Sequence, residues 1–405
     1  MDNLILRPEY LQQLISFKDK KIIKVVTGIR RCGKSTLFDL YCDYLTNHGV
    51  DKEQIIRINL EDPDFSNLDN YKKLYDYIKE KLTDRMNYIF IDEVQTVPEF
   101  QRAVDGLFIK ANCDVYITGS NAYLLSGELA TLLSGRYVEI KMLPLSFKEY
   151  LSAFEDKSDL ILKYNNYITG SSFPYVLNLS SRQEILSYLD GIYSTIVLKD
   201  IAQRKNILDI SILDSVIRYM FDNIGNLCSS TKIANSLTSS GRKISFHTVD
   251  SYLSALTDSF ILHKVSRYDI KGKQLLTTGF KYYLTDIGLR YYLLGSKKAD
   301  MGHILENVVY LELIRRGYNV YVGKSDASEV DFIAINDEGE EYYQVAYTVI
   351  GESTDTNGRT ILERELAPLN SIKDHNPKYL LTMDFTPFTS HNGIRQINVL
   401  EWLLK

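Results

Sequence analysis

Short apolar runs alternate with segments of helical spacing over the first third of the chain. The runs are rich in Ile, Val, Tyr and Phe, as expected of buried strands in a parallel sheet. They are found at residues 22–26, 54–60, 88–91, 115–118 and, after a helical stretch, within 132–140. The segments between them carry apolar residues three and four positions apart, at residues 35–47, 67–82 and 98–110. This alternation predicts an α/β fold built on a parallel sheet.

The rest of the chain has a different pattern. Residues 146–205 are helical and loop-like, with a strongly apolar helix expected at 188–203. Further helices are expected at 210–223, at 230–237 and after a cap at Ser245, followed by two strands at 260–268 and 274–284. That succession predicts a winged helix. From residue 301 a helix to residue 316 precedes strands at 328–333, 342–346 and 379–382, and an amphipathic segment closes the chain at 398–404.

The stretch between the first strand and the helix at 35–47 reads G-x-x-x-x-G-K-S-T over residues 28–36. Its two glycines permit backbone conformations and close approaches that a side chain would block. Loop amides at the start of a helix form an anion site, where Lys34 can reach the β- and γ-phosphates and the Ser35 hydroxyl can ligate Mg²⁺. The expected nucleotide-binding residues are Gly28, Arg31, Cys32, Gly33, Lys34, Ser35 and Thr36.

Two carboxylates follow directly after the apolar run at 88–91. Asp92 would hold Mg²⁺ directly or through water, and Glu93 would orient or deprotonate the attacking water. The next strand ends at Ser120 and Asn121, which would lie beside the γ-phosphate as a sensor or, as the alternative, cap a helix. These residues predict hydrolysis of a nucleoside triphosphate with Mg²⁺.

Arg136 stands at the start of the fifth strand. An arginine at that place can be offered to the nucleotide of a neighbouring subunit, where it would stabilise transition-state charge. An ordinary surface ion pair is the equal alternative. Arg182 and Arg204 also lie in segments that could face a neighbour.

Composition narrows the class of protein. The chain has 405 residues, of which 45% are hydrophobic and 24% charged, as in an ordinary globular protein. Its formal charge of −5 does not indicate nucleic-acid binding by the chain as a whole. Its four cysteines lack C-x-x-C spacing, which argues against a zinc site or disulfide framework and fits a reducing cytoplasm. No apolar run approaches membrane-spanning length. We therefore expect a cytoplasmic protein without a membrane partner.

Five motifs carry a family resemblance, at residues 28–36, 89–93, 117–121, 133–136 and 143–150. Over nearly its whole length the chain resembles the bacterial and archaeal AAA-type ATPases with a C-terminal nuclease-like domain of unknown function. The resemblance implies an additional-strand P-loop core, ATP rather than GTP, and a homo-oligomer with shared active sites. The expected domains are an ATPase core at 1–145, a helical lid or linker at 146–205, a winged helix at 206–295 and a nuclease-like domain at 296–405.

The last of these domains resembles the PD-(D/E)xK nucleases, in which an acid on one strand and an acid-x-lysine on the next bind metal and activate water. Glu306 and Asp331 match that pattern, but Gln344 takes the next acidic position and Ala346 the lysine position. Neither supplies a negative charge or an activating amine. We expect a nuclease-like fold without catalysis, unless another lysine such as Lys324 projects into the site.

The predicted winged helix raises the question of a DNA partner. The outward positions of its candidate recognition helix include Asp250 but neither Lys nor Arg, whereas the wing region is basic at Lys264, Arg267, Lys271, Lys273 and Lys281. A packing or oligomerisation module is the slightly stronger alternative. We expect ATP hydrolysis coupled to movement of the C-terminal modules; the alternative function is an ATP-switched nucleic-acid-binding regulator with slow turnover.

Overall fold

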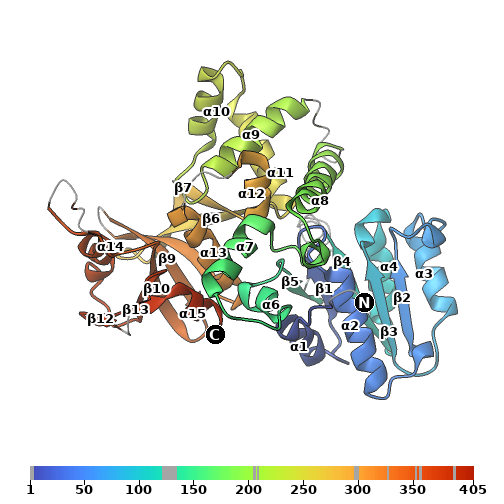
Figure 1. The fold of residues 1–405 in the computed structure, drawn as a ribbon. Coiled ribbons are helices and arrows are strands. Elements are labelled where there is room, and N and C mark those ends of the chain that lie inside the picture. The colour runs from blue at the N-terminus through green and yellow to red at the C-terminus, as the bar shows by residue number, and fades with distance from the viewer. Residues whose placement is uncertain are drawn as a thin grey trace. The chain divides into compact units, whose positions relative to one another are not determined.

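The computed structural model describes residues 4–120, 135–203, 207, 209–295, 301–325, 328–351, 354, 358–385 and 389–405. Its contacts divide the chain into two compact units (Figure 1). The first unit comprises residues 1–144, 173–178 and 258–260, and the second comprises 145–172, 179–257 and 261–405. None of the helices in these described ranges is long and apolar enough to cross a membrane.

The first unit is built on a five-stranded parallel sheet with the strand order β2-β3-β4-β1-β5. Its strands are β1 (Ile23–Thr27), β2 (Ile55–Asn59), β3 (Asn87–Asp92), β4 (Cys113–Gly119) and β5 (Tyr137–Lys141). All four pairings between them are parallel, which confirms the α/β prediction. The carboxyl ends of β1, β3 and β4 meet at one edge because β4 lies between the other two.

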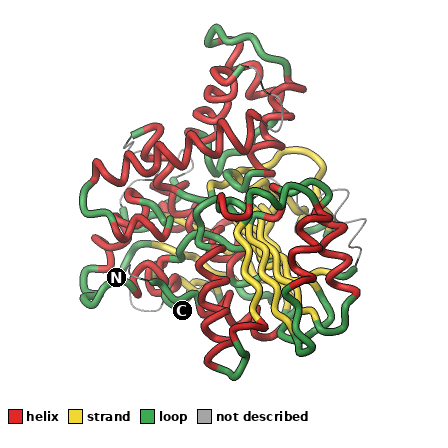
Figure 2. Tube along the Cα trace, turned by 90° about the vertical axis from the view of Figure 1, so that its right-hand side faces the viewer, coloured by secondary structure: helices red, strands yellow, loops and turns green. Residues whose placement is uncertain are grey.

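Helices cover both faces of this sheet, as Figures 1 and 2 show. They are α1 (Pro8–Ser16), α2 (Lys34–Asn47), α3 (Tyr71–Glu80) and α4 (Phe100–Ile109), with 3-10 turns at Lys52–Gln54, Pro63–Phe65 and Val94–Thr96. Side chains alternate between the faces of a strand. Ile89 and Ile91 accordingly join the apolar cluster with α3 and α4, while the Phe90 ring packs 5.1 Å from that of Phe38 on α2.

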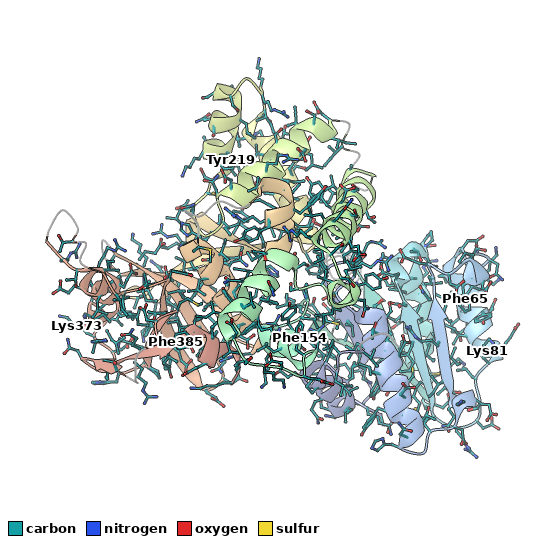
Figure 3. The ribbon with its side chains drawn as sticks, viewed as in Figure 1. Phe65, Lys81, Phe154, Tyr219, Lys373 and Phe385 are labelled. Atoms are coloured by element: carbon teal, nitrogen blue, oxygen red, sulfur yellow. The ribbon has the colours of Figure 1, made fainter. Side chains whose placement is uncertain are left out.

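The predicted helix at 67–82 is shorter in the structure because a cap delays its start. The Asn70 side chain accepts hydrogen bonds from the backbone amides of Lys72 and Lys73, both at 3.1 Å, which fixes the first turn at Tyr71. Just before this helix lies Phe65, labelled in Figure 3, whose ring meets that of Tyr77 edge-on with 5.9 Å between centroids. Residues 67–69, expected to open the helix, precede its first turn, and Leu68 among them is buried.

The second unit begins with helices. They are α6 (Phe147–Ser152), α7 (Leu160–Gly170), α8 (Arg182–Ser194), α9 (Ile210–Asp222), α10 (Ser230–Ser239), α11 (Phe246–Asp258) and α12 (Ile287–Leu294), with a π-helix at Thr195–Gln203. The apolar helix expected at 188–203 is thus the end of α8 followed by the π-helix. Ser245 caps α11 as predicted, since its hydroxyl accepts a 3.1 Å hydrogen bond from the Thr248 amide.

An eight-stranded sheet completes the second unit, with the order β12-β13-β11-β10-β9-β8-β6-β7. Its strands are β6 (Leu262–Asp269), β7 (Gln274–Leu284), β8 (Asn319–Ser325), β9 (Ser328–Asn336), β10 (Gly339–Ala346), β11 (Lys378–Thr382), β12 (Thr389–His391) and β13 (Ile394–Asn398). Its helices are α13 (Met301–Arg315), α14 (Ile361–Asn370) and α15 (Val399–Leu403). The hairpin β6–β7, expected as a wing, pairs in parallel with β8 and so belongs to the C-terminal sheet.

Candidate functional site

The loop between β1 and α2 has an unusual backbone. Arg31 has φ 68° and Gly33 has φ 104°, both in the left-handed region that a residue with a side chain rarely adopts. A Cβ on Gly28 would lie only 2.1 Å from the carbonyl oxygen of Met142. Gly28 is therefore required by close packing. A strained non-glycine residue such as Arg31 points to a functional loop.

Arg7 stabilises this loop through hydrogen bonds to backbone carbonyl oxygens, a role that the sequence did not indicate. Its side chain is buried and donates to the carbonyl oxygens of Leu143 at 2.9 Å and Cys32 at 3.3 Å. The loop is thereby tied to the chain that leaves β5. Burial also raises the pKa of the Cys32 thiol, so this cysteine is a packed neutral group.

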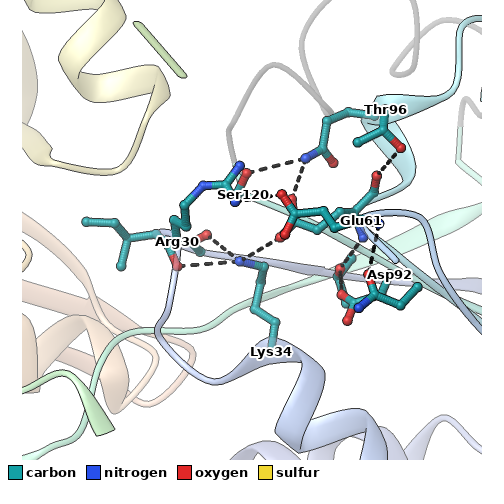
Figure 4. A network of polar contacts seen from close by, with 12 residues as sticks. Arg30, Lys34, Glu61, Asp92, Thr96 and Ser120 are labelled. Atoms are coloured by element: carbon teal, nitrogen blue, oxygen red, sulfur yellow. Dashed lines mark hydrogen bonds and ion pairs between the residues drawn. The ribbon is translucent and has the colours of Figure 1, made fainter. Parts of the chain in front are cut away.

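Lys34 opens α2 and lies within the loop, as Figure 4 shows. Its side chain is 4% exposed, and its Nζ donates to the carbonyl oxygens of Gly28 at 3.1 Å and Ile29 at 3.4 Å. The same ammonium is 3.4 Å from Oε1 of Glu93. Ser35 and Thr36, one and two positions further along the helix, are exposed.

Asp92 ends β3 and is fully buried. The Thr118 hydroxyl donates to its Oδ1 and accepts a 2.9 Å hydrogen bond from the backbone amide of Glu93, so Thr118 positions both acids. Arg57 approaches from β2, with Nη2 3.1 Å from the Ser35 carbonyl oxygen and 3.5 Å from Oδ2 of Asp92. Arg57 thus links the backbone of Ser35 to the carboxylate of Asp92, the two residues predicted to hold Mg²⁺.

Glu93 turns out of the strand in a left-handed conformation, φ 53° and ψ 47°. Its Oε2 accepts a 2.5 Å hydrogen bond from Gln95 Nε2, which also lies 3.3 Å from the Ser120 hydroxyl. Burial would raise the pKa of Glu93, but the Lys34 ammonium and the Gln95 hydrogen bond outweigh it and hold that pKa below its ordinary value. The Glu93 carboxylate is therefore ionised and held in place.

The other predicted residues are not at this site. Arg136 precedes β5, whose Tyr137 pairs with Ile23 at the start of β1, so Arg136 lies at the sheet edge opposite the loop. There its Nη1 forms a 2.7 Å ion pair with Asp105, as in the alternative expected from sequence. Asn121 and Arg204 lie outside the described residues, and Arg182 donates to the Thr169 carbonyl.

Sequence reasoning missed Arg7, Arg57, Gln95 and Thr118. A charged residue in the apolar strand at 54–60 was the signal for Arg57, and a hydroxyl two positions before Ser120 was the signal for Thr118. Arg7 becomes visible only through its contacts with distant parts of the chain, and Gln95 only through the turn that brings its amide to the nearby Glu93 carboxylate.

The acidic residues of the C-terminal domain meet a lysine that the sequence analysis had placed on the wing. Glu306 and Asp331 face Lys281 of β7, and it is Lys281, rather than Lys324, that hydrogen-bonds to Glu306. Gln344 accepts from the Asp331 amide at 3.4 Å, and Ala346 ends β10. In the described part of the chain, no group of three His, Cys, Asp or Glu residues is placed to hold a metal ion.

Comparison with known proteins extends these observations. An AAA domain family matches residues 20–151, and a domain of unknown function (DUF8612) matches residues 161–300. The chain is 43% identical to an "uncharacterized protein" of Haemophilus influenzae over 99% of both chains. It is 33% identical to the "uncharacterized protein MJ1544" of Methanocaldococcus jannaschii over 87% of this chain and 79% of that one.

Among solved structures, the Walker-type ATPase PABY2304 of Pyrococcus abyssi aligns with a TM-score of 0.50 and 14% identity. The alignment covers 71% of this chain and 95% of the other, and at this identity it shows a shared fold. The two uncharacterized relatives match far more closely, and the loop, the buried acid and the strand order lie within the matched AAA domain. The chain therefore belongs to the family of these two relatives, and its residues 20–151 form a P-loop domain of the AAA type.

Proposed function

We propose that this protein binds ATP with Mg²⁺ at residues 28–36 and hydrolyses it. One observation carries the proposal: Lys34, Asp92 and Glu93 come together at the edge of the sheet where the loop lies, with the Lys34 ammonium 3.4 Å from the Glu93 carboxylate. A cation, a buried acid and a second ionised acid at a helix N-terminus are the groups that phosphoryl transfer to water requires.

The residues present suit ATP and Mg²⁺. Ser35 and Thr36 are exposed. The Lys34 ammonium donates to carbonyl oxygens of the loop, and a bound phosphate would take their place as its hydrogen-bond acceptor. Ser35 and Asp92 would hold Mg²⁺, which when bound neutralises charge on the β- and γ-phosphates. Preference for ATP over GTP rests on the family.

Glu93 is the group proposed to orient the attacking water. Its carboxylate stays ionised beside Lys34, and Gln95 and Ser120 hold it from the other side. Phosphate entering the loop would draw Lys34 away from Glu93, which frees the carboxylate to accept a hydrogen bond from water. Ser120, already bonded to Gln95, is the proposed sensor, together with Asn121.

The same reasoning supports movement of the C-terminal modules. Residues 173–178 belong to the first unit, where Pro174 Cγ lies 3.7 Å from the position of a Cβ on Gly33. Pro174 thus lies beside the loop. Nucleotide binding there would shift Pro174 and, through it, the lid or linker expected at 146–205. To complete the site of a neighbouring subunit, Arg136 would exchange its ion pair with Asp105 for the nucleotide bound there, and the proposed active form is then a homo-oligomer.

We further propose that residues 296–405 form the nuclease-like domain. The succession α13, β8, β9, β10, α14, β11, with antiparallel pairing of β8–β9–β10 and parallel pairing of β10–β11, supports this assignment. Gln344 and Ala346 supply neither the acid nor the lysine of the motif on β10. The lysine that does reach the acids, Lys281 of β7, is held by Glu306 and Glu329, so the domain would bind a partner without cutting.

The alternative function, an ATP-switched nucleic-acid-binding regulator, depends on the basic hairpin β6–β7. The sequence expectation was wrong for Lys281, which is 4% exposed and ion-paired, and so cannot contact phosphates. Lys271 and Lys273 at the hairpin turn are exposed. They are the residues by which DNA would bind, and their pairwise replacement by alanine should then weaken it.

The deciding experiment measures ATP turnover and ATP binding of wild type and Glu93→Gln, each without DNA, with duplex DNA and with single-stranded DNA. We expect wild type to turn over ATP and Glu93→Gln to bind it with little hydrolysis, about 10²–10⁴-fold slower. Stimulation by DNA would favour the regulator. Wild type that binds ATP without Glu93-dependent turnover under any condition contradicts the hydrolase proposal.

A further inference from the structure

Lys281 joins three acidic side chains from two other elements of the second unit. From β7, its Nζ lies 2.9 Å from Oε1 of Glu306 on α13, 2.9 Å from Oε1 of Glu329 on β9, and 4.0 Å from Oδ1 of Asp331 on the same strand. The side chains of Lys281 and Glu306 are 5% and 7% exposed. A single ammonium thus occupies the centre of a largely buried acidic cluster.

Glu306 and Asp331 have further hydrogen-bonding partners within the chain. The Tyr283 hydroxyl donates to Oε1 of Glu306 at 2.5 Å, and His303 Nδ1 lies 3.3 Å from the other oxygen of that carboxylate. The Val345 amide donates to Oδ2 of Asp331 at 2.9 Å. These contacts leave the lysine as the cation on which the acids converge.

The three acids outnumber the single ammonium, and the pKa values within the cluster are shifted accordingly. Burial would raise the pKa of Glu306, but Lys281 and the hydrogen bonds from His303 and Tyr283 hold it below its ordinary value. Burial, followed by the charge of Glu306, raises the pKa of Asp331 well above its usual range. Lys281 itself stays charged because the three acids overcome the effect of burial on its pKa.

A divalent metal does not fit this arrangement. Bound to Glu306 and Asp331 at the usual oxygen distances of about 2.0–2.6 Å, it would stand within a few ångströms of the ammonium and be repelled by it. Gln344 would add no negative charge, and its amide nitrogen already donates to Glu365 at 3.1 Å. The residues expected to hold the metal of the nuclease-like site therefore already have hydrogen-bonding or ionic partners inside the protein.

We propose that Lys281 is a built-in cation that stands in for the divalent metal at Glu306 and Asp331, so that the nuclease-like domain binds no metal there. In place of a cutting site, the cluster fastens the hairpin strand β7 to α13 and β9. The hairpin expected as a wing is then rigidly attached to the C-terminal domain. This inference concerns the second unit and is independent of ATP hydrolysis.

The proposal is tested by measuring Mn²⁺ binding to the full chain, without nucleotide, by calorimetry. Four proteins are compared: wild type, Asp331→Asn, Lys281→Ala and Lys281→Ala/Asp331→Asn. Any Mn²⁺ held by the first unit is common to all four and cancels. We expect wild type and Asp331→Asn to bind alike, and Lys281→Ala to gain a Mn²⁺ whose affinity falls about tenfold or more in the double variant.

Two results would overturn the proposal: wild type holding a Mn²⁺ that Asp331→Asn loses, or a folded Lys281→Ala gaining none. If circular dichroism shows that Lys281→Ala does not fold, the wild-type and Asp331→Asn pair still decides, since Asp331-dependent binding refutes the built-in cation. Lys264→Ala is the matched control, because Lys264 is an exposed lysine of the neighbouring strand, 3.8 Å above the Phe280 ring. It should bind Mn²⁺ as wild type does.

Discussion

Replacement of Gly28 by alanine would disturb the phosphate loop by a calculable amount. The new Cβ would lie 2.1 Å from the Met142 carbonyl oxygen and 3.1 Å from the Cys32 sulfur. Close carbon–oxygen contacts are about 3.3 Å, so the loop and the chain after β5 must separate by about 1 Å. Met142 cannot readily move away, because its amide donates a 2.7 Å hydrogen bond to the Thr27 carbonyl at the end of β1.

The loop is therefore expected to give way, and with it the amides that would bind phosphate. A misplacement of about 1 Å at a ligand site costs on the order of 100-fold, or about 2.7 kcal/mol. Titration with a fluorescent ATP analogue in Mg²⁺ should show this loss for Gly28→Ala, with thermal melting measured on the same samples to show that the variant is folded.

Gly49→Ala is the matched control for this change. Gly49 also has a positive φ, 87°, but no atom lies within 4 Å of the position of its Cβ. It should melt somewhat lower, because alanine is strained at that φ, and bind the analogue as wild type does. If folded Gly28→Ala binds within about threefold of wild type, close packing of this glycine does not shape the site and the reasoning is refuted.

Three further predictions concern the first unit. The side chains of Lys24 and Asp114 form a buried ion pair, 0% and 2% exposed, and Lys24→Met leaves Asp114 buried without its ammonium partner. This change should lower the unfolding free energy, measured by calorimetry, by about 3–5 kcal/mol, and Lys24→Met/Asp114→Asn should recover part of the loss. A loss below about 1 kcal/mol would contradict the reasoning. Arg7→Leu removes the donor to three backbone carbonyl oxygens, those of Cys32, Leu143 and Pro144, and should weaken ATP binding about tenfold. An unchanged affinity would show that these hydrogen bonds are not needed for binding. Burial would raise the pKa of Glu93, but Lys34 holds it in the folded protein below its ordinary value of 4.5. The pair therefore stabilises the nucleotide-free protein above pH 4.5, and this stabilisation is lost as the pH falls through the lower folded-state pKa. The melting temperature of wild type minus that of Glu93→Gln should therefore shrink on acidification, and a constant difference would argue against the pair.

Much of the fold of the first unit could be predicted because its signals are local. Each strand there was located to within a few residues, since a buried parallel strand is a continuous apolar run. Boundaries failed where a single side chain set them, as Asn70 does for α3. In the second unit, α12, β8, β12, β13 and α14 were not predicted. The hairpin β6–β7 was assigned to a separate domain, because a strand's hairpin partner is local in the sequence but its other neighbour in the sheet is not.

The candidate site divides in the same way. Residues 28–36 and the pair Asp92 and Glu93 are visible in the sequence because each motif is contiguous and its geometry follows from a strand ending at a loop. Arg57 beside Asp92, 35 positions away, and Lys281 beside Glu306, 25 positions away, are not. Which distant charges meet depends on strand order and on the desolvation that makes them pair, and both arise only when the sheets have formed.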